Sequence, residues 1–212
     1  MILKQFAILL LIFLAVPAAQ AHPVAFQGAL GLMSYNQPDM TDWQIAYSLT
    51  SKLAVGFDYY RDSMEPTTKS YYIPRLNWLV HRWNGKDHQA NIYLFGGYGL
   101  VNSGGVNRGA AFGGVEADYE TRSLYVSGKA TTRIAKDLSD STMYQARAGI
   151  APYEGDYEGL NTWLILQGQY FPNSAVDKVR VGPVLRFFYR NVLWETGVTS
   201  QGMWNFNFMV HF

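Results

Sequence analysis

The sequence predicts an all-β protein, a closed antiparallel β-barrel of about twelve strands, with about ten or about eight strands as the alternatives. Three observations lead to this prediction. Apolar and polar residues alternate with a period of two through most of the chain after residue 21. The alternating segments are roughly ten residues long, and polar turn clusters separate them. Finally, the chain ends in the alternating run WNFNFMVHF, at 204–212. An aromatic end is unusual for a soluble domain, whose last residues fray in water.

Residues 1–21 are expected to be a cleaved signal peptide, and the remainder, 22–212, to be the barrel. A basic residue precedes an apolar run at 6–16, and the small-residue site Ala19-Gln20-Ala21 follows it. Cleavage there would make His22 the new amino-terminus, whose amine and imidazole could chelate a metal ion. A chance terminal histidine is the favoured interpretation, so we predict no metal site and no cofactor.

Composition limits the possible folds and partners. The chain has 17 basic and 16 acidic residues, which argues against a nucleic-acid partner. It contains no cysteine, so backbone pairing and packing must hold the fold together without disulfides. After the leader, no stretch approaches the roughly 18 apolar residues of a transmembrane helix. Membrane-spanning helices are therefore excluded by the sequence, whereas membrane-spanning strands are not.

The first half of the barrel is predicted from the alternation. Its expected strands are 24–35, 43–50, 53–60, 71–83, 90–101 and 109–119. A three-residue turn after Leu49 would place Trp43 opposite Tyr59 on the apolar face. Ile92 and Leu94 likewise lie on one face, opposite polar and small residues. In every segment one face is apolar.

The second half follows the same pattern. Its expected strands are 124–134, 143–153, 162–171, 179–189, 192–199 and 204–212. A two-residue turn between the tenth and eleventh segments would place Phe187 opposite Trp194 and Arg186 opposite Glu195. A shift of one residue would destroy both matches, so the register is a stringent prediction. Pro183 lacks an N–H group, which predicts a bulge or a later start of the tenth strand.

The alternation fits two kinds of barrel with opposite polarity. A soluble lipocalin-like barrel would point its charges to water, and a transmembrane barrel would point its apolar face to lipid. The apolar faces end in residues such as Trp43, Tyr119 and Tyr189, as in the aromatic girdles of membrane barrels. Only Arg82 falls on the apolar face, at a strand end where a charge costs less than the roughly 2–4 kcal/mol at mid-bilayer. The pattern therefore favours a transmembrane barrel, whose closure pairs every backbone group.

The final strand carries a more specific resemblance. Its apolar residues alternate up to the last position of the chain, and they are Trp204, Phe206, Phe208, Val210 and Phe212. A signal peptide followed by alternating segments and a terminal phenylalanine resembles the β-signal of Gram-negative outer-membrane proteins as a class. The resemblance implies a location in the outer membrane, contact with outer-membrane lipid, and recognition of this assembly signal by the barrel-assembly machinery.

The polar faces of the expected strands would form the lumen, with an excess of basic groups. Asp58 lies on one of these faces. The predicted pore-lining residues are Arg75, His81, Glu116, Asp118, Lys129, Arg133, Arg147, Arg180, Arg186, Arg190 and Glu195. One interpretation is a small pore or passive transporter whose partly basic lumen favours small anionic solutes. The alternative is a non-conducting structural or surface-receptor barrel whose lumen is plugged by ion pairs.

A third interpretation, an outer-membrane lipid-modifying or hydrolytic enzyme, is the least favoured. His81 would point inward beside Arg75 and Asn77 and could act as a base, but such a histidine is more often part of a polar network. No G-x-S-x-G motif occurs. The glycine-rich run at 102–115 lacks the G-K-[ST] ending of a phosphate loop. We therefore predict no catalytic residues.

Overall fold

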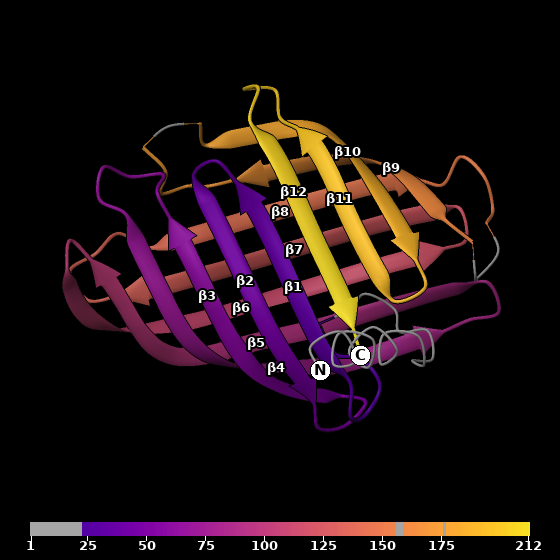
Figure 1. Cartoon of the computed structure of the whole chain (residues 1–212), viewed down its shortest axis with the longest axis horizontal. Helices are drawn as coiled ribbons and strands as arrows, with labels where there is room; N and C mark the ends of the chain where they lie inside the picture. The colour runs from indigo at the N-terminus through magenta and orange to yellow at the C-terminus, as the bar shows by residue number, and fades with distance from the viewer. Residues whose placement is uncertain (1–22, 156–158, 176) are drawn as a thin grey trace, which may run out of the picture.

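The computed structural model describes residues 23–155, 159–175 and 177–212, and over them the chain forms a closed barrel of antiparallel strands (Figure 1). Consecutive strands pair in chain order, and β1 pairs with β12 to close the wall. The described part of the chain contains no helix that is long and apolar enough to cross a membrane. The predicted fold class and the predicted strand number are confirmed.

The strands of the wall have the following bounds. They are β1 (Leu30–Gln37), β2 (Met40–Ser48), β3 (Leu53–Asp62), β4 (Lys69–Asn84), β5 (His88–Ser103), β6 (Val106–Thr121), β7 (Leu124–Ala135), β8 (Ser141–Ile150), β9 (Asn161–Tyr170), β10 (Val179–Tyr189), β11 (Val192–Val198) and β12 (Trp204–His211). We call the end where β1 begins and β12 finishes the terminal end. The opposite end, where β1 turns into β2, is the loop end.

The predicted hairpin registers are confirmed. Phe187 lies opposite Trp194 and Arg186 lies opposite Glu195 in the β10–β11 pair. The rings of Phe187 and Trp194 stack with their centroids 5.2 Å apart. Trp43 lies opposite Tyr59 in the β2–β3 pair. These registers were predictable because each follows from a short turn and a matched apolar face.

The first strand begins later than predicted. The expected strand at 24–35 starts only at Leu30, because Gly28 adopts a φ of 87° that an extended strand does not allow. Of residues 23–29, Pro23 and Val24 are buried at the terminal end of the barrel, whereas Phe26, Gln27 and Gly28 are exposed. There Val24 is completely buried, and the carbonyl oxygen of Pro23 accepts a hydrogen bond of 3.2 Å from Asn77 Nδ2.

Pro183 does not produce the predicted bulge or late strand start. β10 begins at Val179 and keeps a constant register against β9, with Pro183 opposite Leu166. On its other side, the ladder with β11 begins at Val184, opposite Gly197. Pro183 therefore lies one residue outside the β10–β11 ladder, so its missing N–H group removes no hydrogen bond from that ladder.

A bulge occurs instead in β4, where the sequence analysis expected none. Leu79 lies opposite Tyr93, but His81 lies opposite Ile92, so Val80 is one extra residue. An extra residue moves all later side chains to the opposite face. His81 therefore lies on the outer face, with its ring 4.2 Å from that of Trp83, and its predicted place inside is wrong.

The same bulge turns Arg82 inward. Its Nε donates to Asn91 Oδ1 at 2.6 Å, and its Nη2 donates to the hydroxyl of Tyr93 at 3.2 Å. Asn91 and Tyr93 are both buried. The prediction that Arg82 lies on the apolar face is therefore wrong, and that face loses the one charge assigned to it.

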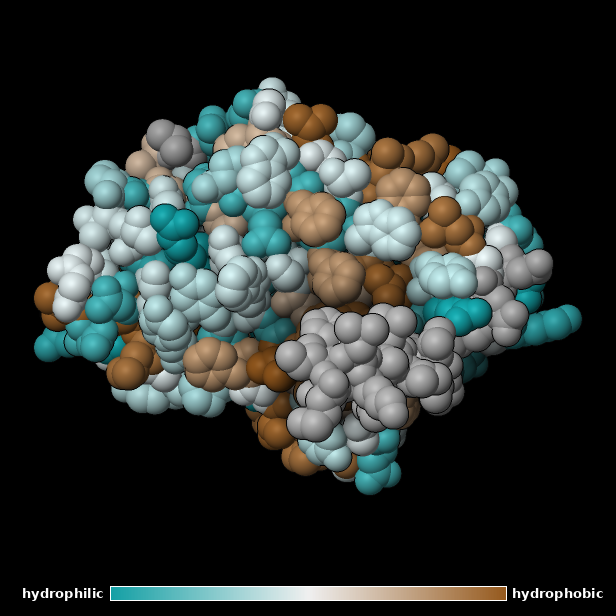
Figure 2. All heavy atoms as spheres, in the orientation of Figure 1, coloured by the Kyte–Doolittle hydropathy of each residue, from teal (hydrophilic) through white to brown (hydrophobic). Residues whose placement is uncertain are grey.

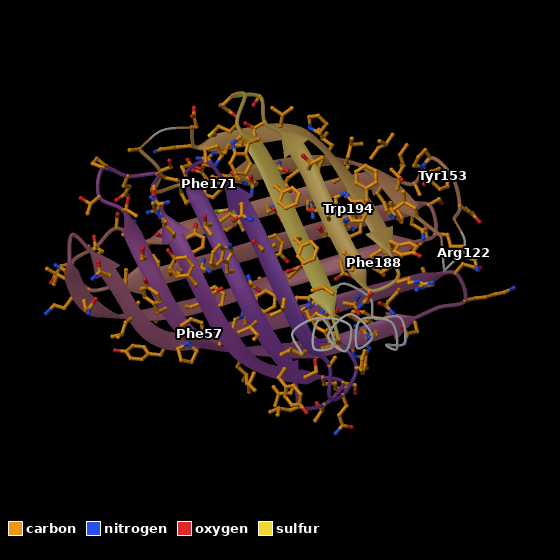
Figure 3. The ribbon with its side chains drawn as sticks, in the orientation of Figure 1. Phe57, Arg122, Tyr153, Phe171, Phe188 and Trp194 are labelled. Atoms are coloured by element: carbon orange, nitrogen blue, oxygen red, sulfur yellow. The ribbon has the colours of Figure 1, made fainter. Side chains whose placement is uncertain are left out.

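The outer face of the barrel is apolar and exposed. Leu166 is 60% exposed and Phe206 is 47% exposed, and both lie on strands rather than in loops. Figure 2 shows apolar side chains on the outer surface of the wall, and Phe57 projects outward in Figure 3. Of the residues in the predicted assembly signal, Trp204, Phe206 and Phe208 are exposed, Phe212 is half-buried and Val210 is buried.

Candidate functional site

Asp58 of β3 is the centre of the first charged cluster in the lumen. Its carboxylate is completely buried, with Arg75 Nη1 of the neighbouring β4 at 3.3 Å. Its other oxygen accepts a 2.8 Å hydrogen bond from Arg133 Nη2 of β7. Because β4, β5 and β6 lie between β3 and β7 in the wall, this bond crosses the lumen. Arg133 also lies 3.7 Å from a carboxylate oxygen of Asp42 on β2.

Glu195 of β11 is the centre of the second cluster. It accepts hydrogen bonds from Arg186 Nε at 2.7 Å, Arg147 Nη2 at 2.8 Å and Asn207 Nδ2 at 2.7 Å. Arg147 stands on β8, across the lumen from β11. The carboxylate is 1% exposed, so these three donors replace the water that it loses on burial.

Arg180 of β10 forms a third crossing near the loop end. Its guanidinium makes a forked pair with Asp39, with Nη1–Oδ1 at 2.9 Å and Nη2–Oδ2 at 2.6 Å. Nη1 also donates to Gln37 Oε1 at 2.9 Å, and Gln37 Nε2 donates to Gln169 Oε1 at 2.8 Å. This series of hydrogen bonds runs from Arg180 on β10 to Gln37 on β1 and on to Gln169 on β9. It therefore connects opposite sides of the lumen.

The loop end is closed further by the connections above it. Lys69 Nζ lies 3.5 Å from an Asp62 oxygen and donates to the carbonyl oxygen of Ser139 at 3.0 Å. Met64, which follows β3, is buried there. Phe171, which follows β9, is also buried and is labelled in Figure 3. Phe171 also lies under the guanidinium of Arg180, at 4.6 Å from its ring centroid.

Aromatic faces cover several of the buried cations. Arg133 lies 3.7 Å from the ring centroid of Tyr60, and Arg186 lies 4.2 Å from that of Tyr125. Such contacts stabilise a cation that has lost its water. Lys129 is more open: its side chain is 16% exposed, and its Nζ pairs at 3.3 Å with Glu116 on the adjacent strand.

The structure places most of the predicted pore-lining residues inside. They are Arg75, Glu116, Asp118, Lys129, Arg133, Arg147, Arg180, Arg186 and Glu195. Asp118 is buried and accepts a 2.6 Å hydrogen bond from Asn91. Arg190 is the second exception beside His81. It is exposed in the turn between β10 and β11, with a positive φ of 55°, so its predicted place in the lumen is wrong.

The six basic groups at these positions are all paired, and they share four carboxylates, those of Asp39, Asp58, Glu116 and Glu195. Each of Arg75, Lys129, Arg133, Arg147, Arg180 and Arg186 has a carboxylate oxygen at 2.6 to 3.3 Å. Three acids at the loop end, Asp39, Asp42 and Asp62, were not predicted. The expected second strand began too late for Asp42, the expected third strand ended too early for Asp62, and Asp39 lies in the turn between β1 and β2. Extending the alternation from Gln44 back to Asp42, and from Tyr60 on to Asp62, would have found two of them.

The chemistry of the site is electrostatic and structural. Among residues 23–155, 159–175 and 177–212, no group of three or more His, Cys, Asp or Glu side chains is placed to hold a metal ion. His22 and the expected leader lie outside the described residues. The outward position of His81 removes the candidate base that the sequence offered.

Comparisons with known proteins identify the fold. No protein-family model matches the chain, and no curated protein matches it. The structure of the KdgM porin in complex with disordered oligogalacturonate aligns with this chain at a TM-score of 0.51 and 7% sequence identity. The alignment covers 87% of this chain and 98% of the porin chain. KdgM porin without that ligand has a TM-score of 0.47 at 8% identity, covering 87% and 98% of the two chains. A loop-deletion mutant of OmpT, an outer membrane protein of Vibrio cholerae, has a TM-score of 0.32 at 8% identity, covering 87% and 97%. Only the first of these three similarities has a TM-score above 0.5, and it shows that the fold of this chain is a porin-like barrel.

Proposed function

We propose that the protein is an outer-membrane β-barrel whose lumen is closed, a structural or surface-receptor barrel rather than an open pore. The observation that carries this proposal is the set of charged bonds that cross the lumen. Asp58 joins β3 to β7, Glu195 joins β11 to β8, and Arg180 joins β10 to the β1–β2 turn. An ion crossing the barrel would have to separate these pairs.

The proposed membrane location rests on the outer face and on the closed wall. The exposed apolar side chains suit lipid, and the barrel leaves no free strand edge in it. The likeness to outer-membrane barrels supports the same location. Export through the leader at 1–21, and recognition of the final strand by the barrel-assembly machinery, belong to this proposal.

Recordings in a planar lipid bilayer test the closed lumen. Purified, refolded protein is expected to give no steady single-channel conductance. The matched control is Glu154→Gln, which changes an ion pair at the surface, where Arg122 and Glu154 are 81% and 63% exposed. A stable conductance in both proteins would contradict the proposal. Fractionation of cells and heat-dependent migration on a denaturing gel test the location, and a protein that stays soluble in the periplasm would contradict it.

A narrow pore for small anionic solutes is the second candidate. It is favoured by the likeness to the KdgM porin and by the partly exposed Lys129–Glu116 pair. If the barrel conducts, Arg180→Ser and Arg186→Ser should shift its ion preference toward cations. Arg190→Ser is the control, because Arg190 lies in an exposed turn. Equal selectivity in all these variants would remove the arginines from the pore hypothesis.

A further inference from the structure

A small polar chamber remains inside the closed lumen. Its volume is about 40 Å³, and its wall includes Tyr35, Asp42, Gln145 and Gln167. One water molecule needs about 10–15 Å³ of such volume, so the chamber has room for about three. A sugar or an amino acid is too large for it.

Two side-chain atoms of residues that line the chamber are buried and lack a hydrogen-bond partner among the described residues. They are Arg133 Nε, which is a donor, and Gln167 Oε1, which is an acceptor. The two residues are 3% and 4% exposed. Burying a polar atom without a partner is costly, so both atoms call for a ligand that can accept from one and donate to the other.

The charges around the chamber are already committed to one another. Arg133 Nη2 is bound to Asp58, Lys129 is paired with Glu116, and Asp42 Oδ1 accepts from Gln44 at 2.9 Å. The other polar groups on the wall include the hydroxyls of Tyr35 and Thr131 and the side-chain amides of Gln145 and Gln167, all of which are neutral. This combination favours a neutral ligand with both donors and acceptors over an ion.

The chamber lies nearer to the loop end than to the terminal end. Gln37 and Met40, which end β1 and begin β2 at the loop end, are on its wall. Toward the terminal end, an apolar layer follows in which Met33 lies opposite Met209 and Met209 lies opposite Leu193. All three of these side chains are buried. These side chains belong to one cluster of buried apolar residues that also includes Leu79 of β4 and Phe95 of β5, on the other side of the lumen.

We propose that this chamber is a binding site for water-sized neutral polar molecules, with water itself as the usual ligand, and that they enter from the loop end. Arg133 Nε donates to the bound molecule, and Gln167 Oε1 accepts from it. In this proposal the chamber holds water, is reached from the loop end, and is closed toward the terminal end by apolar side chains. The inference rests on the barrel fold and on the chamber, and it holds whether or not ions pass through the lumen.

Single cysteines test the chamber, because the natural chain has none. Gln145→Cys places a thiol on the chamber wall, Leu193→Cys places one in the apolar layer, and Ser51→Cys places one in an exposed turn. The probe is methyl methanethiosulfonate, a small neutral reagent. The natural chamber is too small for it, but replacing the glutamine side chain by the shorter cysteine side chain enlarges the chamber at the point of attack. The cysteine thiolate attacks it to form a methyl disulfide, methanesulfinate leaves, and the thiol proton goes to solvent. Mass spectrometry of the folded protein in detergent follows the reaction.

In the folded barrel, Gln145→Cys is expected to react with the small reagent, but more slowly than Ser51→Cys. Leu193→Cys is expected not to react. The larger anionic reagent sulfonatoethyl methanethiosulfonate should leave Gln145→Cys unmodified. The chamber is contradicted if Gln145→Cys does not react with the small reagent, or if Leu193→Cys reacts equally fast. Modification by the anionic reagent would instead contradict the closed lumen. If Gln145→Cys fails to fold, Thr131→Cys on the same wall replaces it.

The side of entry is tested in the Gln145→Cys background. Asp39→Asn removes the ion pair with Arg180 at the loop end and should raise the rate of modification. Val24→Ala, at the terminal end, should leave that rate unchanged. The reverse order of the two effects would contradict entry from the loop end.

Discussion

Buried ions in the lumen are held by partners that are distant in sequence. Asp58 lies between two arginines, and Arg133 lies between two carboxylates and the ring of Tyr60. Removing water from such charges is costly, so each group depends on all its partners at once. A single substitution therefore affects the whole cluster.

Asp58→Asn should destabilise the barrel strongly. It leaves Arg75 and Arg133, which are 5% and 3% exposed, without their main counter-charge. The expected loss is about 3–5 kcal/mol in the free energy of unfolding. Urea titration of the folded barrel in micelles, followed by tryptophan fluorescence, measures it. The control Glu154→Gln should change the same free energy by about 0–1 kcal/mol. An equal effect of the two variants would contradict the role of Asp58.

The neighbours His81 and Arg82 offer a second test. Arg82→Leu removes hydrogen bonds to Asn91 and Tyr93 inside the barrel and should cost about 1.5–3 kcal/mol. His81→Leu changes an outer, exposed side chain and should have little effect. The same urea titration compares them. A larger loss for His81→Leu would show that β4 has no bulge.

At the scale of the element, each strand follows its pattern until something interrupts the period of two. Alternation and short turns made the registers of the β2–β3 and β10–β11 hairpins predictable. The bulge at Val80 was not predictable, because only the partner strand β5 shows that one residue is extra. Gly28 ends the extended pattern before β1, and the sequence alone did not show its positive φ.

The final strand should be sensitive at its last residue. Phe212→Ser removes the terminal aromatic residue of the proposed assembly signal, so less heat-modifiable barrel should reach the outer membrane. Tyr47→Ser is the control, because Tyr47 is an exposed outer residue near the same end of the barrel. Immunoblots of unheated membrane fractions measure the folded protein. Equal loss in both variants would point to lipid contact rather than to an assembly signal.

For the whole molecule, the main issue is which face meets lipid. Leu166 is 60% exposed in the middle of β9, so Leu166→Arg would place a charge in the apolar band. In a bilayer this should cost about 2–4 kcal/mol, measured by urea unfolding in lipid vesicles. Ser51→Arg, in an exposed turn, is the control. Tolerance of Leu166→Arg would mean that the outer face meets water.

Local patterns in the sequence were enough to predict the barrel, the number of its strands, two hairpin registers and most of the inward-facing charges. These follow from local alternation and from turns, which act between residues close together in the chain. Only the tertiary structure decided which charges meet, because Asp58 and Arg133, or Arg147 and Glu195, come together only when the wall closes. Closure of the wall also pairs the buried basic groups with carboxylates and places Pro23 and Val24 inside the terminal end. A period of two specifies the face of each residue, whereas its partner across the lumen depends on the closure of the whole barrel.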